Sequence, residues 1–78
     1  MTDKYLEISN VEDLKAGDIL CFLNLRVPGE CMRLVIFEVT KRLFKTYVLF
    51  DCTRVQTPGD IYSFQIIDLE PANWRLLA

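Results

Sequence analysis

The sequence has no histidine, and glycine is scarce, with three residues among 78. Without histidine, Ser-His-Asp and Cys-His catalysis are excluded in their usual forms. Gly17, Gly29 and Gly59 are isolated at turn positions, which excludes a glycine-rich phosphate-binding loop. The two serines, Ser9 and Ser63, lie in no nucleophile motif. We therefore expect a protein that is not an enzyme and that binds no cofactor.

Cysteine is also scarce, and the three residues Cys21, Cys31 and Cys52 cannot all pair within one chain. A zinc site without histidine would need thiolates and carboxylates alone, so we expect no metal. We interpret the cysteines as reduced thiols of a cytoplasmic protein. Cys31, two residues before Arg33, is the best candidate for a reactive thiol, but a plain loop cysteine is favoured. An enzyme using Cys31 or paired carboxylates is a minor alternative.

Long apolar runs are absent from the sequence. No run approaches the length needed to cross a bilayer, and the first residues do not join a basic segment to an apolar stretch. We therefore expect no signal peptide and no contact with a membrane. The length predicts a single domain over residues 1–78 with a small interior. Because 51% of the residues are hydrophobic, some apolar side chains are expected to be covered by a partner or a second copy.

Apolar residues alternate with period two along most of the chain, as they do in β-strands. The expected strands are residues 5–8, 19–27, 32–41, 46–53 and 61–69. In residues 72–78 a short strand is favoured slightly over a helix that begins at Pro71. The pattern predicts an all-β fold, either a small antiparallel meander or an SH3-like barrel of about five strands.

Turn residues punctuate these strands. Asn10 is placed to cap a single helical turn near residues 11–14, and Gly17 and Pro58-Gly59 are suited to tight turns. The segment Leu-Lys-Ala-Gly-Asp-Ile-Leu at residues 14–20 resembles the turn that opens many SH3-like barrels. This resemblance implies a fold and no function.

A basic hairpin tip is expected at residues 41–45, where Lys41, Arg42 and Lys45 surround Leu43 and Phe44. Cations beside an exposed aromatic ring can contact phosphates and stack on an unpaired base. The same tip can insert into a protein pocket with an acidic rim. Equally, the tip can be a solvated turn whose Phe44 folds back onto its own sheet.

The segment 34–37 is apolar on both faces of its predicted strand. A strand of this type is usually covered on both sides, or covered by a partner. The sequence therefore predicts a possible homodimer through Leu34, Ile36 and Phe37.

The net charge is −2 and the sequence pI is about 4.9, which argues against a general nucleic-acid binder. The acidic segment that we expect to bind a partner comprises Asp3, Glu7, Glu12, Asp13 and Asp18. Its carboxylates can compete for basic surface that otherwise holds phosphate. In size and charge the chain resembles small phage-encoded modulators, anti-CRISPR proteins among them.

These observations favour a small non-enzymatic protein-binding module, an inhibitor or modulator that occupies a surface of a larger nucleic-acid-handling partner. The alternative is a small β-barrel that binds single-stranded nucleic acid through the basic hairpin 41–45.

Overall fold

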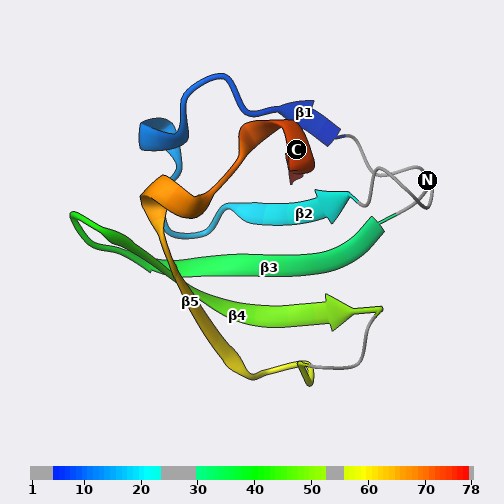
Figure 1. Ribbon diagram of the computed structural model, residues 1–78. Coiled ribbons are helices and arrows are strands. Elements are labelled where there is room, and N and C mark those ends of the chain that lie inside the picture. The colour runs from blue at the N-terminus through cyan, green and yellow to red at the C-terminus, as the bar shows by residue number, and fades with distance from the viewer. Residues whose placement is uncertain (1–4, 24–29, 53–55, 78) are drawn as a thin grey trace.

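The computed structural model describes residues 5–23, 30–52 and 56–77, and these residues form β-strands, loops and three 3-10 turns (Figure 1). The strands are β1 (Tyr5–Glu7), β2 (Ile19–Leu23), β3 (Glu30–Val39), β4 (Leu43–Asp51), β5 (Ile61–Gln65) and β6 (Trp74–Leu77). The 3-10 turns are η1 (Val11–Asp13), η2 (Ile66–Asp68) and η3 (Pro71–Asn73). The predicted all-β fold is therefore confirmed.

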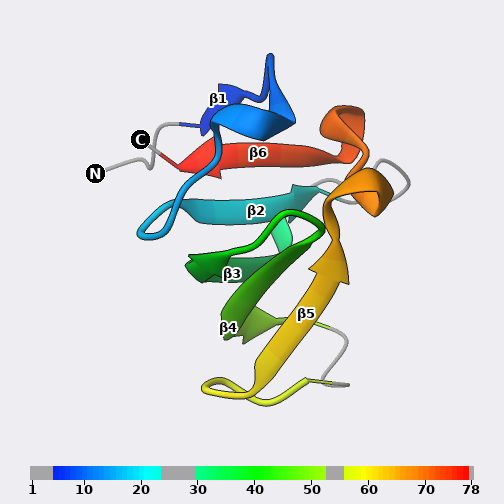
Figure 2. The ribbon, with the colours of Figure 1, turned by 90° about the vertical axis from the view of Figure 1, so that its left-hand side faces the viewer.

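The six strands form one antiparallel sheet in the order β1-β6-β2-β3-β4-β5. Strands β2 to β5 are neighbours in sequence and in space, which is the predicted meander. The last strand, β6, instead lies between β1 and β2, so the two ends of the chain pair with each other. Figure 2 shows the sheet curling strongly, with β5 crossing obliquely at the end opposite β1.

The predicted turns are present where the structure describes them. The Asn10 side chain accepts a hydrogen bond from the backbone N–H of Glu12 at 3.0 Å and caps η1. Gly17 and Gly59 have φ of 97° and 93°, the left-handed region that favours glycine. Residues 24–27 of the predicted strand 19–27 lie outside the described residues.

The hairpin between β3 and β4 is shorter than expected. β3 ends at Val39 and β4 begins at Leu43, whereas the sequence placed the tip over residues 41–45. The Thr40 hydroxyl oxygen accepts hydrogen bonds from the backbone N–H of Leu43 at 3.0 Å and of Arg42 at 3.3 Å. A threonine side chain thus stabilises this turn, which contains no glycine.

The C-terminal segment combines both structures considered for it. Pro71 is the first residue of η3, and the strand β6 follows at once. β5 ends at Gln65, four residues before the predicted end of its strand, because η2 turns the chain away from the sheet.

The core lies on the concave face of the curled sheet. Leu20, Leu34 and Val48 are fully buried at consecutive cross-strand positions of β2, β3 and β4. The Phe64 ring packs against Trp74 at a centroid distance of 5.8 Å and against Phe44 at 5.6 Å. Trp74 is therefore a core residue.

Candidate functional site

The convex face of the sheet, which points away from this core, holds an apolar row that crosses all six strands. The pairing register aligns one residue of each strand directly beside the next, in the order Tyr5, Leu77, Ile19, Val35, Tyr47 and Ile61. Tyr47 and Ile61 are 40% and 62% exposed, and Val35 is half-buried. A sheet that packs one face on a core normally presents polar residues on the other, so this row departs from the usual pattern.

Three further apolar side chains widen the row. The Phe37 ring stacks on Tyr47 with a centroid distance of 4.3 Å. Leu49 lies at a register shift between β3 and β4, and Phe50 pairs with Arg33; both are more than 40% exposed. We call the surface formed by these nine residues the outer face: Tyr5, Ile19, Val35, Phe37, Tyr47, Leu49, Phe50, Ile61 and Leu77.

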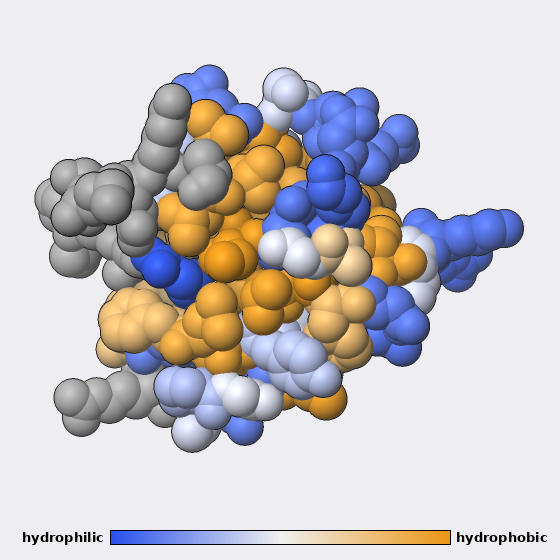
Figure 3. Space-filling model, turned by 180° about the vertical axis from the view of Figure 1, so that it is seen from behind, coloured by the Kyte–Doolittle hydropathy of each residue, from blue (hydrophilic) through white to orange (hydrophobic). Residues whose placement is uncertain are grey.

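Figure 3, which views the molecule from behind, shows hydrophobic residues gathered over the middle of this side, with hydrophilic residues at its upper and right-hand edges. Side chains of this size that are 40–60% exposed leave on the order of 100 Å² each in water. The four most exposed, Tyr47, Leu49, Phe50 and Ile61, together present roughly 400 Å². A patch of this size is within the range of the largest apolar patch on a typical monomer, and such a patch is often functional.

The predicted homodimer segment is only partly on this surface. Leu34 and Ile36 point into the core and are 1% exposed or less, so their assignment to an interface is wrong. Phe37 lies on the outer face, as the predicted interface requires. Val35, which the prediction did not include, lies there instead of Leu34 and Ile36. The sequence showed that both faces of the strand are apolar, but the direction in which the sheet curls decides which face is enclosed.

A second cross-strand row borders the apolar one and contains Glu7, Arg75, Cys21, Arg33 and Phe50. The Arg33 guanidinium donates a hydrogen bond to the Tyr5 hydroxyl at 3.4 Å. The Arg75 guanidinium donates to the backbone carbonyls of Pro71, Ala72 and Trp74 at 2.8–3.4 Å. Both arginines are thus engaged within the chain.

The acidic residues predicted to bind a partner divide into two groups. Glu7 on β1 and Glu12 and Asp13 on η1 are exposed. Asp18 has a structural contact, because its carboxylate accepts the backbone N–H of Lys15 at 2.9 Å and closes the turn before β2. Asp3 lies outside the described residues. The acidic candidates that face solvent are therefore concentrated on β1 and η1, at one edge of the sheet.

The basic hairpin does not present the aromatic ring expected of a nucleic-acid contact. Phe44 is 1% exposed and lies in the core opposite Phe64, so it is unavailable as a partner-binding residue. The sequence allowed either an exposed ring at the hairpin tip or a ring folded back onto its own sheet, and the structure has the second arrangement. The Lys45 ammonium lies 2.8 Å from the Glu38 carboxylate, and Leu43 is half-buried.

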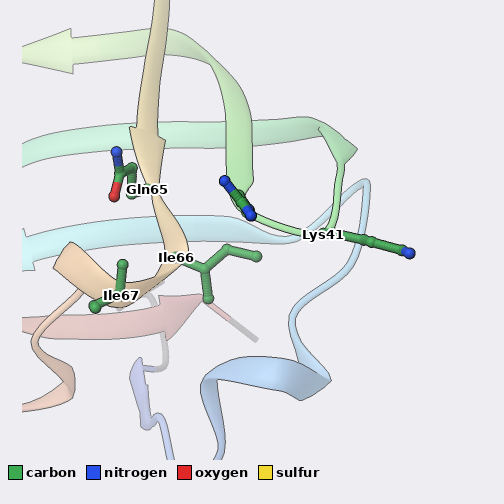
Figure 4. A pocket seen from close by; sticks show the side chains of 5 residues that line it. Lys41, Gln65, Ile66 and Ile67 are labelled. Carbon is green, nitrogen blue, oxygen red and sulfur yellow. The ribbon is translucent and has the colours of Figure 1, made fainter.

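The two remaining hairpin residues, Lys41 and Arg42, are exposed and line a shallow hollow of about 450 Å³. Gln65, Ile66 and Ile67 form the rest of its lining. In Figure 4 the Lys41 side chain extends away from Ile66 and Ile67. Ile67 is 83% exposed, so the hollow is an open part of the surface and not an enclosed pocket.

Two of the three cysteines lie together. Cys21 is buried, whereas Cys31 is half-buried and Cys52 is exposed. A hydrogen bond to Cys52, burial, and the charge interactions with Cys52 and Asp51 together raise the pKa of the Cys31 thiol to about 11. Such a thiol is protonated at neutral pH, which weakens the case for Cys31 as a nucleophile.

Among the described residues, no three metal-ligating side chains come together, and no helix is long and apolar enough to span a membrane. Comparison of the chain with protein-family models, curated proteins and solved structures finds no match. Function therefore has to be inferred from the surface itself, and the outer face is its most distinctive feature.

Proposed function

We propose that this chain is a small non-enzymatic protein-binding module that docks through its outer face onto a larger nucleic-acid-handling protein and thereby modulates it. The observation that carries this proposal is the apolar row that crosses six strands on the face opposite the core. Leaving this surface in water is unfavourable, and covering it would stabilise a complex at about 25 cal/mol per Å² before the costs of association.

Charge indicates the chemistry of the partner. Glu7 lies in the row that borders the outer face, and Glu12 and Asp13 are exposed on the turn that follows β1. These carboxylates complement a surface whose apolar centre is flanked by lysine or arginine. A protein that binds nucleic acid has such basic groups, and occupying them would exclude phosphate.

The size of the outer face is consistent with this mode of binding. A standard interface buries about 800 Å² on each partner. The centre of such an interface is apolar, and its rim is polar. The roughly 400 Å² of exposed apolar surface would form the core, and the acidic edge would form part of the rim.

The test compares two isoleucines. Ile61 lies on the outer face and Ile67 lies on η2, and both are more than 60% exposed. A tagged chain captures proteins from extracts of its source cells, and the affinity of each captured protein is then measured after purification. We expect Ile61→Lys to raise the Kd roughly 10- to 100-fold, because burial of a branched side chain contributes about 1.5–3 kcal/mol. The matched control Ile67→Lys should leave the Kd unchanged.

Three outcomes would contradict the proposal. In the first, both lysine variants bind the captured protein as tightly as the wild type. In the second, the double variant Glu12→Lys/Asp13→Lys has no effect on the Kd at low salt, which would mean that the acidic edge of this chain does not contact the partner. In the third, the outer face is occupied by a second copy, and sedimentation over a dilution series then gives a mass near twice 9.1 kDa that Ile61→Lys reduces.

The nucleic-acid alternative has its own test. With Phe44 in the core and Lys45 beside Glu38, Lys41 and Arg42 are the hairpin residues left to contact phosphate. Strongly salt-dependent binding of a short single-stranded oligonucleotide, lost in Lys41→Ala/Arg42→Ala, would replace the protein-binding proposal with this one.

A further inference from the structure

The Cys31 and Cys52 thiols are neighbours across the β3–β4 hairpin, at the end opposite its tip. Met32 pairs with Asp51 in the sheet, and continuing this register by one residue on each strand sets Cys31 opposite Cys52. The backbone N–H of Cys52 donates to the carbonyl of Cys31 at 2.8 Å, which confirms the continuation. The two thiols also share a hydrogen bond.

This arrangement matches what a disulfide requires. Residues directly opposite in an antiparallel pair have Cα atoms about 4.5–5.5 Å apart. A disulfide joins residues whose Cα atoms are about 4.4–6.8 Å apart, so the strands need not move to form the bond. Cys52 is exposed and accessible to a small oxidant, while Cys21 is fully buried.

We infer that Cys31 and Cys52 form a site of reversible oxidation, at which a small-molecule disulfide such as glutathione disulfide converts the two thiols into one intrachain disulfide. This inference is independent of the proposed function.

The chemistry proceeds by two thiol–disulfide exchanges. The Cys52 thiolate attacks one sulfur of the small disulfide, forms a mixed disulfide and releases the first small thiolate, which is protonated by water. Cys31 then loses its proton, and its thiolate attacks the Cys52 sulfur. The Cys31–Cys52 bond forms, the mixed disulfide breaks, and a second small thiol leaves. Two protein thiols are oxidised, and one small disulfide is reduced to two thiols.

The order of attack follows from the environment of the two sulfurs. Cys31 is half-buried and its thiol is hydrogen-bonded to Cys52, so it is held in the protonated form. Cys52 is the more exposed sulfur and therefore meets the oxidant first. Cys31 acts as the resolving thiol.

The new bond would close a loop over residues 32–51, which includes Val35, Phe37 and Tyr47 of the outer face. Closing this loop restricts the unfolded chain, so we expect the oxidised protein to melt at a temperature higher by on the order of 10 °C.

The experiment uses the reduced, folded chain and glutathione disulfide, followed by intact mass and peptide mapping without reductant. We expect the mass to fall by two hydrogen atoms and the map to show the peptide that joins Cys31 to Cys52. Cys31→Ser should instead retain one glutathione on Cys52. Cys21→Ser, the matched control, should form the same disulfide as the wild type.

Two results on the wild type alone would overturn the inference. One is a mixed disulfide with glutathione that persists on Cys52 although Cys31 is present. The other is a chain that keeps three free thiols at a glutathione ratio that oxidises ordinary paired cysteines. Neither depends on whether a variant folds.

Discussion

Removing the Phe44 ring should destabilise the fold severely. The side chain is 1% exposed and packs against Phe64 inside the sheet. Truncation of a buried phenylalanine to alanine costs about 3–5 kcal/mol, through lost apolar burial and the cavity left behind. A chain of this length has a total stability of about 4–12 kcal/mol, so Phe44→Ala should remove a large part of it. The expected fall in Tm is on the order of 20 °C.

The assay is urea and thermal unfolding followed by circular dichroism, with Phe50→Ala as the matched control. Phe50 is 47% exposed on the outer face, and its truncation should cost less than about 1 kcal/mol. Phe44→Leu, which fills most of the cavity, should cost less than about 1.5 kcal/mol and remains measurable if the alanine variant does not fold. If Phe44→Ala is no more destabilising than Phe50→Ala, the ring is at the surface and the basic hairpin regains its role as a binding tip.

Three smaller effects follow from particular contacts. Thr46→Val should cost about 1–2 kcal/mol in urea unfolding, because the buried Thr46 hydroxyl donates to the Tyr62 carbonyl at 2.6 Å; a neutral result would mean that this bond contributes nothing. Gly59→Ala should lower the free energy of unfolding by about 1–2 kcal/mol. The cause is the φ of 93° alone, since no atom lies within 4 Å of the added methyl, and an unchanged Tm would contradict the left-handed conformation of Gly59. The folded-state pKa of Cys31, about 11, lies above the ordinary 9.0, so the free energy of unfolding should fall as pH rises from about 9 to 11. The Cys31→Ser variant should lack this contribution, so the difference between the two curves should retain the fall, and parallel curves would refute the prediction.

The strands were predictable because apolar and polar residues alternate locally along them. β2, β4 and β5 each show the period-two pattern, and Asn10 and Gly59 have the side chains that their turns require. The pairing of β6 between β1 and β2 is a contact between the two ends of the chain, and no local pattern specifies it.

Phe44 was assigned to the binding tip because the predicted start of its strand was wrong. Alternation of Phe44, Thr46 and Val48 with Lys45 and Tyr47 continues back to the first residue of β4, and reading it that far would have placed the ring in the core. The basic composition of residues 41–45 indicated a loop instead.

The outer face could be predicted only in part, for a different reason. β3 is apolar on both sides, so its pattern is symmetric and does not distinguish core from surface. The row across six strands depends on registers that include two shifts between β3 and β4, which the sequence does not reveal. The Cys31–Cys52 pair likewise depends on the register of a hairpin whose second strand begins three residues earlier than predicted.

The most direct test of the outer face as a docking surface is methyl NMR of the chain titrated with the purified captured protein. Along β3, Val35 faces outward while Leu34 and Ile36 face the core. We predict that the methyl signals of Val35 and Ile61 shift or broaden on binding, while those of Leu34, Ile36 and Ile67 change little. Shifts confined to Ile67 and its neighbours, with Val35 and Ile61 unaffected, would contradict the account.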